Sequence, residues 1–216
     1  MHVKECIFTP WHLLLGIRPV LGPCVNFFLD SSRNVSLQTN QSFRDRVMDT
    51  KQKQQNRSTL FTGILIGIGI IGFLDETIFH QILQWHTFYW QTDSFGRILS
   101  DGLFHVFSTL LLLWGTFRIW RGRANGTLSS QNILIAGILI GAGGFNFYDG
   151  IIQHAILHLH LVNELVCATS ASRADTILGV CRNDVPYEVA WDLIGFVILA
   201  IGFVLWRRET RITQLD

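Results

Sequence analysis

The sequence is short of charge. Asp, Glu, Lys and Arg make up only 15% of its 216 residues, whereas 49% are hydrophobic and the mean hydropathy is +0.32. An average soluble domain has about 25% charged residues, so the deficit argues against a soluble protein and indicates one whose partner is the lipid bilayer. The formal net charge of +1 lacks the positive surplus of nucleic-acid-binding proteins, and no nucleic-acid partner is expected.

Cysteine is scarce as well. The chain has four cysteines and no Cys-x-x-Cys pair, which is too few for a small fold held together by disulfides. Cys167 and Cys181 share one segment between two hydrophobic stretches, and an oxidising compartment would permit a disulfide there. Two free thiols are an equally good interpretation, so the sequence leaves this pair open.

Long hydrophobic stretches are abundant. A helix needs roughly 20 apolar residues to cross the hydrocarbon core, and four stretches reach or approach that length: residues 60–82, 98–120, 131–157 and 187–206. Pro186 stands at or near the first turn of the last stretch, where proline is well tolerated. The predicted fold is therefore all-α, a polytopic membrane protein whose four transmembrane helices form a domain over residues 59–208.

Basic residues predict the orientation in the membrane, because cytoplasmic loops carry an excess of Lys and Arg. One side has most of them: Arg44, Arg46, Lys51, Lys53, Arg57, Arg118, Arg121, Arg123, Arg207, Arg208 and Arg211. The other side has only Arg97, Arg173 and Arg182. We expect a multi-pass protein of the inner cell membrane, with both termini cytoplasmic and the loops at residues 84–97 and 158–186 outside.

The N-terminal region differs from the rest. Residues 5–30 are apolar but interrupted by three prolines and Arg18, so they make a poor membrane span. Residues 31–58 are polar and predicted to be disordered. Residues 1–58 are therefore expected to be a poorly structured extension, with Met48 as the favoured translation start, and residues 209–216 to be a cytoplasmic tail.

The chain repeats itself. Residues 63–86 align with residues 137–160 at an offset of 74 without a gap, and 13 of the 24 positions are identical. The identical ionisable pairs are Asp75/Asp149, His80/His154 and His86/His160. The repeat predicts two tandem helical hairpins, about 60–123 and 131–207, related by a pseudo-twofold axis along the membrane normal.

Two further features of the repeat carry structural predictions. Gly-x-x-x-Gly pairs at 63/67 and 137/141 predict close helix packing near the cytoplasmic half of the bundle. The second and fourth helices align more weakly, with Asp101 opposite Asp192 and His105 opposite Phe196.

All four predicted helices bring ionisable side chains to one layer, in the outer half of the bilayer. At 1.5 Å per residue, Asp75 lies roughly 22 Å from the start of its span, and His80 lies near the outer edge. Ionisable groups at membrane depth are costly and usually functional. We therefore favour a functional site over a purely structural polar network. The candidate metal ligands are His80, His154, His105, Asp101, Asp75, Asp149, His86, His158, His160 and Asp192, with Glu188 sharing a helix face with Asp192.

Ideal helix geometry suggests which of these residues meet. At 100° per residue Asp75 and His80 point about 140° apart, so one straight α-helix cannot bring both of them and His86 to one ion. The symmetry instead favours His80 and His154 as a pair facing each other across the axis. The remaining expectations are a ligand and orienting carboxylate from Asp101/His105, deeper binding groups at Asp75 and Asp149, and His86, His158 and His160 beyond the bilayer.

Imidazoles with carboxylates suit copper, iron, nickel or zinc, and a haem bound by two histidines between helices is also compatible. The favoured function is therefore binding of a transition metal or haem for redox chemistry or metal handling, with catalysis left open. One alternative is proton- or ion-coupled transport through Asp75 and Asp149, for which four spans would require a homodimer. Another is a non-catalytic membrane assembly factor.

The run "GFLDETIFHQILQWH", together with "DGLFH" and "FYDGIIQH", resembles a bacterial family of four-helix predicted membrane proteins of unknown function. The similarity covers about residues 58–206. The resemblance implies a glycine after the first Asp, where this chain has Glu76, whereas Gly150 keeps the pattern in the second copy. The resemblance implies no catalytic residue. It implies only weakly a respiratory-oxidase partner, and with that partner a copper or haem context.

Overall fold

A computed structural model describes residues 24–169, 171, 174–177 and 179–212. Among these residues the long helices are α1 (Cys24–Asp75), α2 (Ser94–Ala124), α3 (Gln131–Tyr148) and α5 (Val185–Ile212). Four helical segments are long and apolar enough to cross a membrane: Phe43–Ile82, Ser94–Ala124, Gln131–Ile156 and Val185–Arg211. The predicted all-α fold with four spans is confirmed.

The chain divides into two units, Met1–Thr50 and Lys51–Asp216. In the described part of the first unit α1 already begins at Cys24, so residues 31–58, which were expected to be disordered, lie within this helix. No glycine or proline lies between residues 24 and 62, and nothing in this polar sequence breaks a helix. The expectation for residues 5–30 falls mostly outside the described residues, and the start at Met48 stays a prediction.

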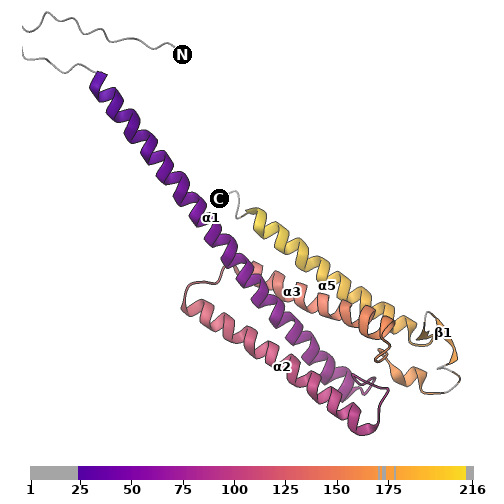
Figure 1. Cartoon of the computed structure of the whole chain (residues 1–216). Coiled ribbons are helices and arrows are strands. Elements are labelled where there is room, and N and C mark those ends of the chain that lie inside the picture. Colours follow the sequence, from indigo (N-terminus) through magenta and orange to yellow (C-terminus); the bar gives the residue numbers. More distant parts are fainter. Residues whose placement is uncertain (1–23, 170, 172–173, 178, 213–216) are drawn as a thin grey trace, which may run out of the picture. The chain divides into compact units, whose positions relative to one another are not determined.

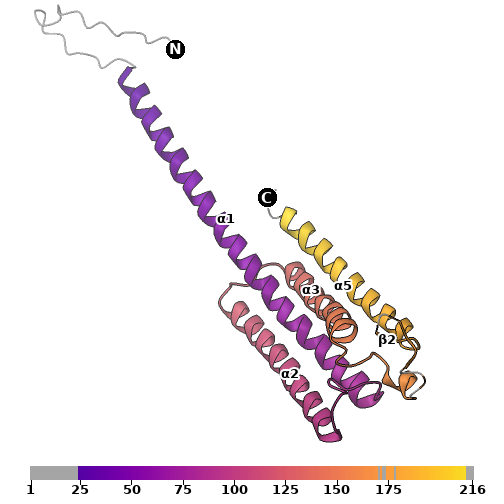
Figure 2. The same cartoon turned by 45° about the vertical axis from the view of Figure 1, so that its right-hand side comes forward.

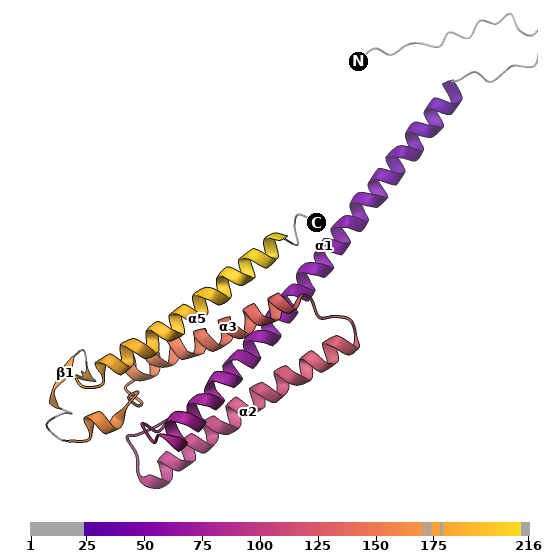
Figure 3. The same cartoon turned by 180° about the vertical axis from the view of Figure 1, so that it is seen from behind.

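Within the second unit α1 and α3 occupy the middle of the bundle, and α2 and α5 flank them (Figures 1 and 2). The same order is visible from behind (Figure 3). In their most apolar windows 50% and 39% of the residues of the two central spans are buried, against 17% in each flanking span. Each flanking helix therefore presents most of its surface to lipid.

Small residues set the distance between the two central helices. A Cβ added to Gly63 would lie 2.9 Å from the Cα of Gly137, and one added to Gly137 would lie 3.0 Å from the Cα of Gly63. One turn further on, Gly67 lies against the backbone of Ile138, and Gly141 lies against the backbone of Ile64. The predicted close packing through the Gly-x-x-x-Gly pairs is confirmed.

The flanking helices pack through glycines as well. These contacts show which residues of α2 in the first hairpin are equivalent to which residues of α5 in the second. Gly69 of α1 lies against the backbone of Leu112 in α2, and Gly143 of α3 lies against the backbone of Leu199 in α5. Since 199 − 112 = 87, residues of α2 and α5 correspond at an offset of 87. Two further contacts show the same offset: Gly115 with Ile66, and Gly202 with Ile140.

This register corrects the alignment of the second and fourth helices. At an offset of 87, Asp101 corresponds to Glu188, and His105 corresponds to Asp192. The sequence alignment, which matched Asp101 to Asp192, was therefore wrong by four residues, about one helical turn. Leu, Ile, Val and Phe replace one another freely on a lipid-facing surface, so an alignment of two such helices slips easily by a turn.

The end of the bundle that carries residues 83–93 and 157–184 is called here the loop end. The central helices continue into it as the π-helices η2 (Glu76–Ile82) and η3 (Asp149–Ile156). The longer loop contains the short helix η4 (Glu164–Cys167) and an antiparallel pair of strands, β1 (Thr176–Ile177) and β2 (Val180–Cys181). A disulfide joins Cys167 to Cys181 and ties η4 to β2, which settles the question that the sequence left open.

The glycine packing predicts opposite effects of one substitution at two positions. Gly137→Ala places a methyl group against the backbone of α1, and overpacking of this kind costs about 1–3 kcal/mol. Gly102→Ala is the matched control, because nothing lies within 4 Å of a Cβ added there. Since alanine favours a helix interior over glycine by roughly 0.5–1 kcal/mol, the control should be slightly stabilised. Thermal unfolding in detergent measures both, and equal melting temperatures would contradict the packing.

Candidate metal centre

Both central helices change from α to π geometry where their ionisable residues begin. A π-helix pairs residue i with residue i+5, and this spacing separates Asp75 from His80 and Asp149 from His154. A carboxylate oxygen lies 3.5 Å from the imidazole Nε2 in the first pair and 3.1 Å in the second. The expectation that Asp75 and His80 point apart assumed an unbroken α-helix, and it was wrong for that reason.

A single residue in the left-handed conformation follows each π-helix and turns the chain back. The φ angle is 52° at Gln84 and 51° at His158, which occupy equivalent positions of the repeat. A non-glycine residue in this conformation costs about 1–2 kcal/mol, and such strain clusters at functional sites. Here the turn brings His86 and His160, two residues later, back toward the carboxylates.

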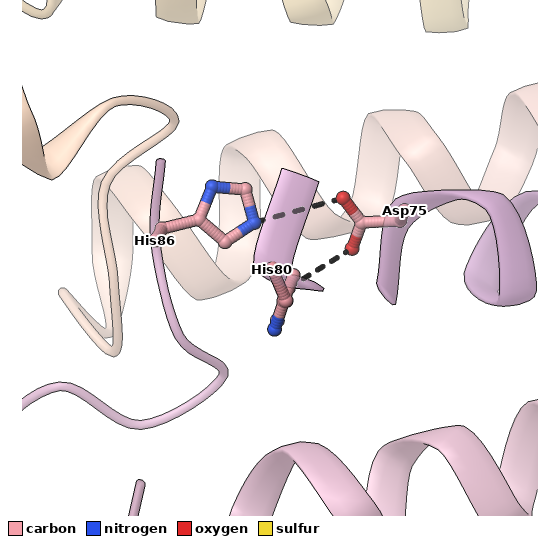
Figure 4. A group of neighbouring side chains, drawn as sticks. All are labelled: Asp75, His80 and His86. Atoms are coloured by element: carbon pink, nitrogen blue, oxygen red, sulfur yellow. Dashed lines mark ion pairs between the residues drawn. The ribbon is translucent and has the colours of Figure 1, made fainter. Parts of the chain in front are cut away.

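The outcome is two equivalent groups of three residues. The first triad is Asp75, His80 and His86. Figure 4 shows the carboxylate beside both imidazoles, with one oxygen paired to each ring; the second oxygen of Asp75 lies 3.6 Å from Nε2 of His86. The second triad is Asp149, His154 and His160, whose corresponding distance is 3.7 Å. In each triad the candidate ligand atoms lie within 4.8 Å of one another, and all six side chains are buried.

Carboxylates from the flanking helices hold one histidine of each triad. Nδ1 of His80 lies 3.1 Å from the carboxylate of Asp101, and Nδ1 of His154 lies 2.9 Å from that of Glu188. Asp101 and Glu188 correspond at the offset of 87, so the symmetry extends to these contacts. Such acceptors fix the tautomer of a metal-binding histidine and orient its ring.

Backbone carbonyls hold the other two histidines, and they come from the opposite hairpin. Nδ1 of His86 donates to the carbonyl of Val162 at 2.8 Å, and Nδ1 of His160 donates to the carbonyl of Phe88 at 3.0 Å. Since 88 + 74 = 162, the two acceptors are equivalent positions of the repeat. Each triad is therefore completed by the loop of the other hairpin.

With every Nδ1 bonded, the four Nε2 atoms remain. They belong to His80, His86, His154 and His160 and are buried. Among the described residues they make no hydrogen bond of good geometry and face only the carboxylates of Asp75 and Asp149, at 3.1 to 3.7 Å. Buried imidazole nitrogens are normally satisfied. Four that converge in pairs on two carboxylates are the arrangement that a pair of cations would complete.

The four imidazoles also show which residues meet at the axis. The rings of His86 and His160 stack with centroids 5.0 Å apart, while His80 and His154 lie 4.4 Å from His86 and His160 respectively. The predicted facing pair of His80 and His154 was therefore wrong. The expectation that His86 and His160 lie apart from the carboxylates was wrong too, because the left-handed turns fold them inward.

Four other predicted ligands lie outside the triads. His105 packs against Phe73, with ring centroids 5.1 Å apart, rather than joining Asp101. His158 provides the left-handed turn, and its carbonyl accepts hydrogen bonds from Trp90 and Gln91. Asp192 lies beside Gly150. Asp101 accepts from Nδ1 of His80 and so orients that ring from outside the triad.

Sequence reasoning missed the place of Glu76. Its carboxylate lies 3.1 Å from Nδ1 of His80, so that Glu76, His80 and Asp101 form a further group of close ligand atoms. In the second hairpin the equivalent residue is Gly150, and a Cβ added there would overlap the carboxylate of Asp192. Each hairpin thus has a further carboxylate beside its triad: the buried Glu76 from η2 in one and the partly exposed Asp192 from α5 in the other. The spacing of four between Glu76 and His80 was the available signal.

Two groups in the longer loop have shifted acidities. Burial, and next the neighbouring imidazoles, lower the pKa of His160 well below its usual value, so this ring is neutral, as a metal ligand must be. Burial and the nearby charge of Glu188 raise the pKa of Asp184 to about 7. Asp184 accepts hydrogen bonds from the backbone of Val162 and Asn163 at 3.1 and 2.9 Å, and so positions the carbonyl that holds His86.

The left-handed turn predicts an unusual order of stability. Gln84→Gly should keep or raise the melting temperature, because glycine adopts this φ without strain. Gln84→Val should lower the melting temperature, because it should reduce the free energy of unfolding by about 1–2 kcal/mol. The same two substitutions at Gln81, inside η2, should give the reverse order, since glycine is the poorer residue within a helix. Thermal unfolding of the four variants tests this, and the same order at both positions would contradict it.

Comparison with known proteins places the chain in a family. Residues 62–209 match the family model described as "Predicted membrane protein (DUF2243)", and the matched range contains both triads and the carboxylates that hold them. No curated protein and no solved structure matches the chain. The chain therefore belongs to the DUF2243 family of predicted membrane proteins, a family of unknown function.

Proposed function

We propose that the protein binds two transition-metal ions, one at each triad, for redox chemistry or for metal handling. One observation carries the proposal: four buried Nε2 atoms, which have no hydrogen-bond partner among the described residues, converge in pairs on Asp75 and Asp149, while each Nδ1 is held by an acceptor. This arrangement presents imidazole nitrogens and carboxylate oxygens, ligand types that suit iron, copper and zinc.

The distances support small ions. Bonds of about 2.0–2.2 Å in tetrahedral geometry place neighbouring ligand atoms about 3.3–3.6 Å apart. The four distances between carboxylate oxygens and Nε2 atoms range from 3.1 to 3.7 Å, so an ion needs only small movements of these side chains. Two histidines and one carboxylate leave coordination positions open, as in iron and zinc sites that act on a further ligand.

The same geometry argues against a haem. A haem bound by two histidines lies between two imidazoles that face each other across the porphyrin. Here both histidines of each triad direct Nε2 toward a carboxylate, and their rings are only 4.4 Å apart. Asp75 or Asp149 would occupy the place that the haem iron requires.

Transport is the weaker alternative. A proton or cation pathway needs polar groups along the whole crossing. Residues 60–74 of α1 and 131–148 of α3 contain no Asp, Glu, His, Lys or Arg, and the ionisable residues of the two central helices gather at the loop end. The arrangement favours a centre that is reached from one face, and a homodimeric transporter would need a pathway outside these two helices.

We further propose that the loop end faces outside, with both termini cytoplasmic in the inner membrane. The distribution of lysines and arginines supports this orientation. The disulfide between Cys167 and Cys181 supports it independently, because disulfides persist in oxidising compartments. A centre on this side could serve a respiratory-oxidase partner, as the family resemblance implies, or act as an assembly factor that holds metal.

Metal content tests the proposal directly. Protein purified in detergent, stripped with chelator and reloaded with Cu²⁺, Fe²⁺ or Zn²⁺, should bind about two ions per chain for at least one of these metals, by elemental analysis. His86→Ala and His160→Ala should each remove one ion, because each deletes one triad ligand. His105→Ala is the matched control and should leave both ions in place.

Two results would overturn the proposal. One is a folded wild-type protein that retains no metal in stoichiometric amount after loading with each ion in turn. The other is equal metal loss in His105→Ala and His86→Ala, which would place the ions elsewhere. An absorption spectrum of the protein as isolated also shows whether a haem is present, against the geometry.

A further inference from the structure

A cavity of about 390 Å³ leads from the surface of the loop end to the first triad. Gln84, Leu165 and Ala168 line it at its exposed end, and His80 and His86 line it at its buried end. Thr87, Arg97 and Glu164 complete the lining, and their exposure is intermediate between those of the two ends. The lining therefore runs from exposed residues to two side chains that are only 5% and 2% exposed.

The exposed end of this cavity opens toward water rather than lipid. Gln84, Leu165 and Ala168 all lie outside the membrane-spanning segments, in the loops that follow η2 and η3. Water and dissolved ions reach such loops, whereas the flanking faces of α2 and α5 meet lipid. The buried end consists of two histidines whose Nε2 atoms have no hydrogen-bond partner among the described residues.

The charges along the cavity favour a cation. Asp75 and Glu76 lie within 3.5 Å of the imidazole of His80 at the buried end, and Glu164 contributes a carboxylate halfway along. A cleft lined by one sign of charge raises the local concentration of the opposite ion and its rate of association. Arg97 is the cation of the lining, and its guanidinium lies 3.6 Å from the carboxylate of Glu164.

Arg97 is held beside that carboxylate rather than beside the triad. Its Nη2 donates to the carbonyl of Trp90 at 2.8 Å, and its Nη1 faces Glu164. The other carboxylate oxygen of Glu164 accepts from the backbone of Thr87 at 3.5 Å. An incoming metal ion would compete with the guanidinium for Glu164 before it reaches His86.

We propose that this cavity is the route by which a divalent transition-metal ion from the aqueous phase reaches the first triad. Glu164 receives the ion halfway, Arg97 competes with it there, and His86 and His80 bind it at the end. The inference rests on the proposed metal centre and adds the route and two residues that set the rate of loading. No bond to carbon forms or breaks, and the ion exchanges water for protein ligands.

The rate of metal loading tests the route. The second triad is first disabled with His160→Ala, so that only the first triad reports. Chelator-stripped protein in detergent is mixed with Co²⁺, and the visible absorption of the bound ion is followed over time. Glu164→Gln should slow loading roughly threefold to tenfold, and Arg97→Gln should speed it by a similar factor. Neither change should alter the final amount of bound Co²⁺, because neither residue is a ligand.

Size and charge controls make the test specific. Ala168→Trp and Leu165→Trp fill the exposed end of the cavity and should each slow loading at least about tenfold. Glu209→Gln, at the opposite end of α5, and Arg182→Gln, on the longer loop but outside the cavity lining, remove the same charges and should leave the rate unchanged.

The outcomes separate the two proposals. If the His160→Ala protein binds no Co²⁺ at the first triad, the metal centre itself fails. If it binds Co²⁺ to the same final amount and at the same rate in all four cavity variants, the centre stands and the route is overturned. Equal slowing by Glu209→Gln and Glu164→Gln would also overturn it, because the effect would then be one of overall charge.

Discussion

The backbone contact between α1 and α3 is the constraint on which the rest of the structure depends. With Gly63 and Gly137 at the crossing, the central helices approach until only backbone atoms separate them. That approach brings η2 and η3 together at the loop end, where His86 and His160 stack and each takes its acceptor from the other hairpin. Because each triad borrows a carbonyl from its neighbour, neither hairpin alone could hold its histidines in place.

A second constraint is local and lies in the backbone of η2 and η3. In an α-helix the spacing of five between Asp75 and His80 would separate them, and His86 would lie far along the axis. The π-helix closes the first gap, and the left-handed residue Gln84 closes the second. Both conformations are unfavourable for an ordinary sequence, and both recur at the same repeat positions, where they bring together groups that a regular helix would keep apart.

Much of the fold could be predicted from the sequence, because its physical causes are visible there. Apolar length predicts the four spans, and the repeat that includes Gly63 and Gly137 predicts two hairpins that pack through small residues. Two features could not be predicted. The register of α5 against α2 depends on interchangeable apolar residues, and the pairing within the site depends on a change of helix type that leaves no periodic pattern. All six triad residues were therefore among the ten candidates from the sequence, but the wrong histidines were matched across the axis.

The two hairpins differ in the position of the further carboxylate beside each triad. The second carboxylate beside each triad comes from Glu76 in the first hairpin and from Asp192 in the second. Both cannot occur in one hairpin, because a side chain at position 150 would overlap the carboxylate of Asp192. The second hairpin therefore combines Gly150 with Asp192. At the equivalent positions the first hairpin combines Glu76 with His105. The two hairpins place a carboxylate beside each triad from different helices, which indicates that the negative charge at this place matters more than the residue that carries it.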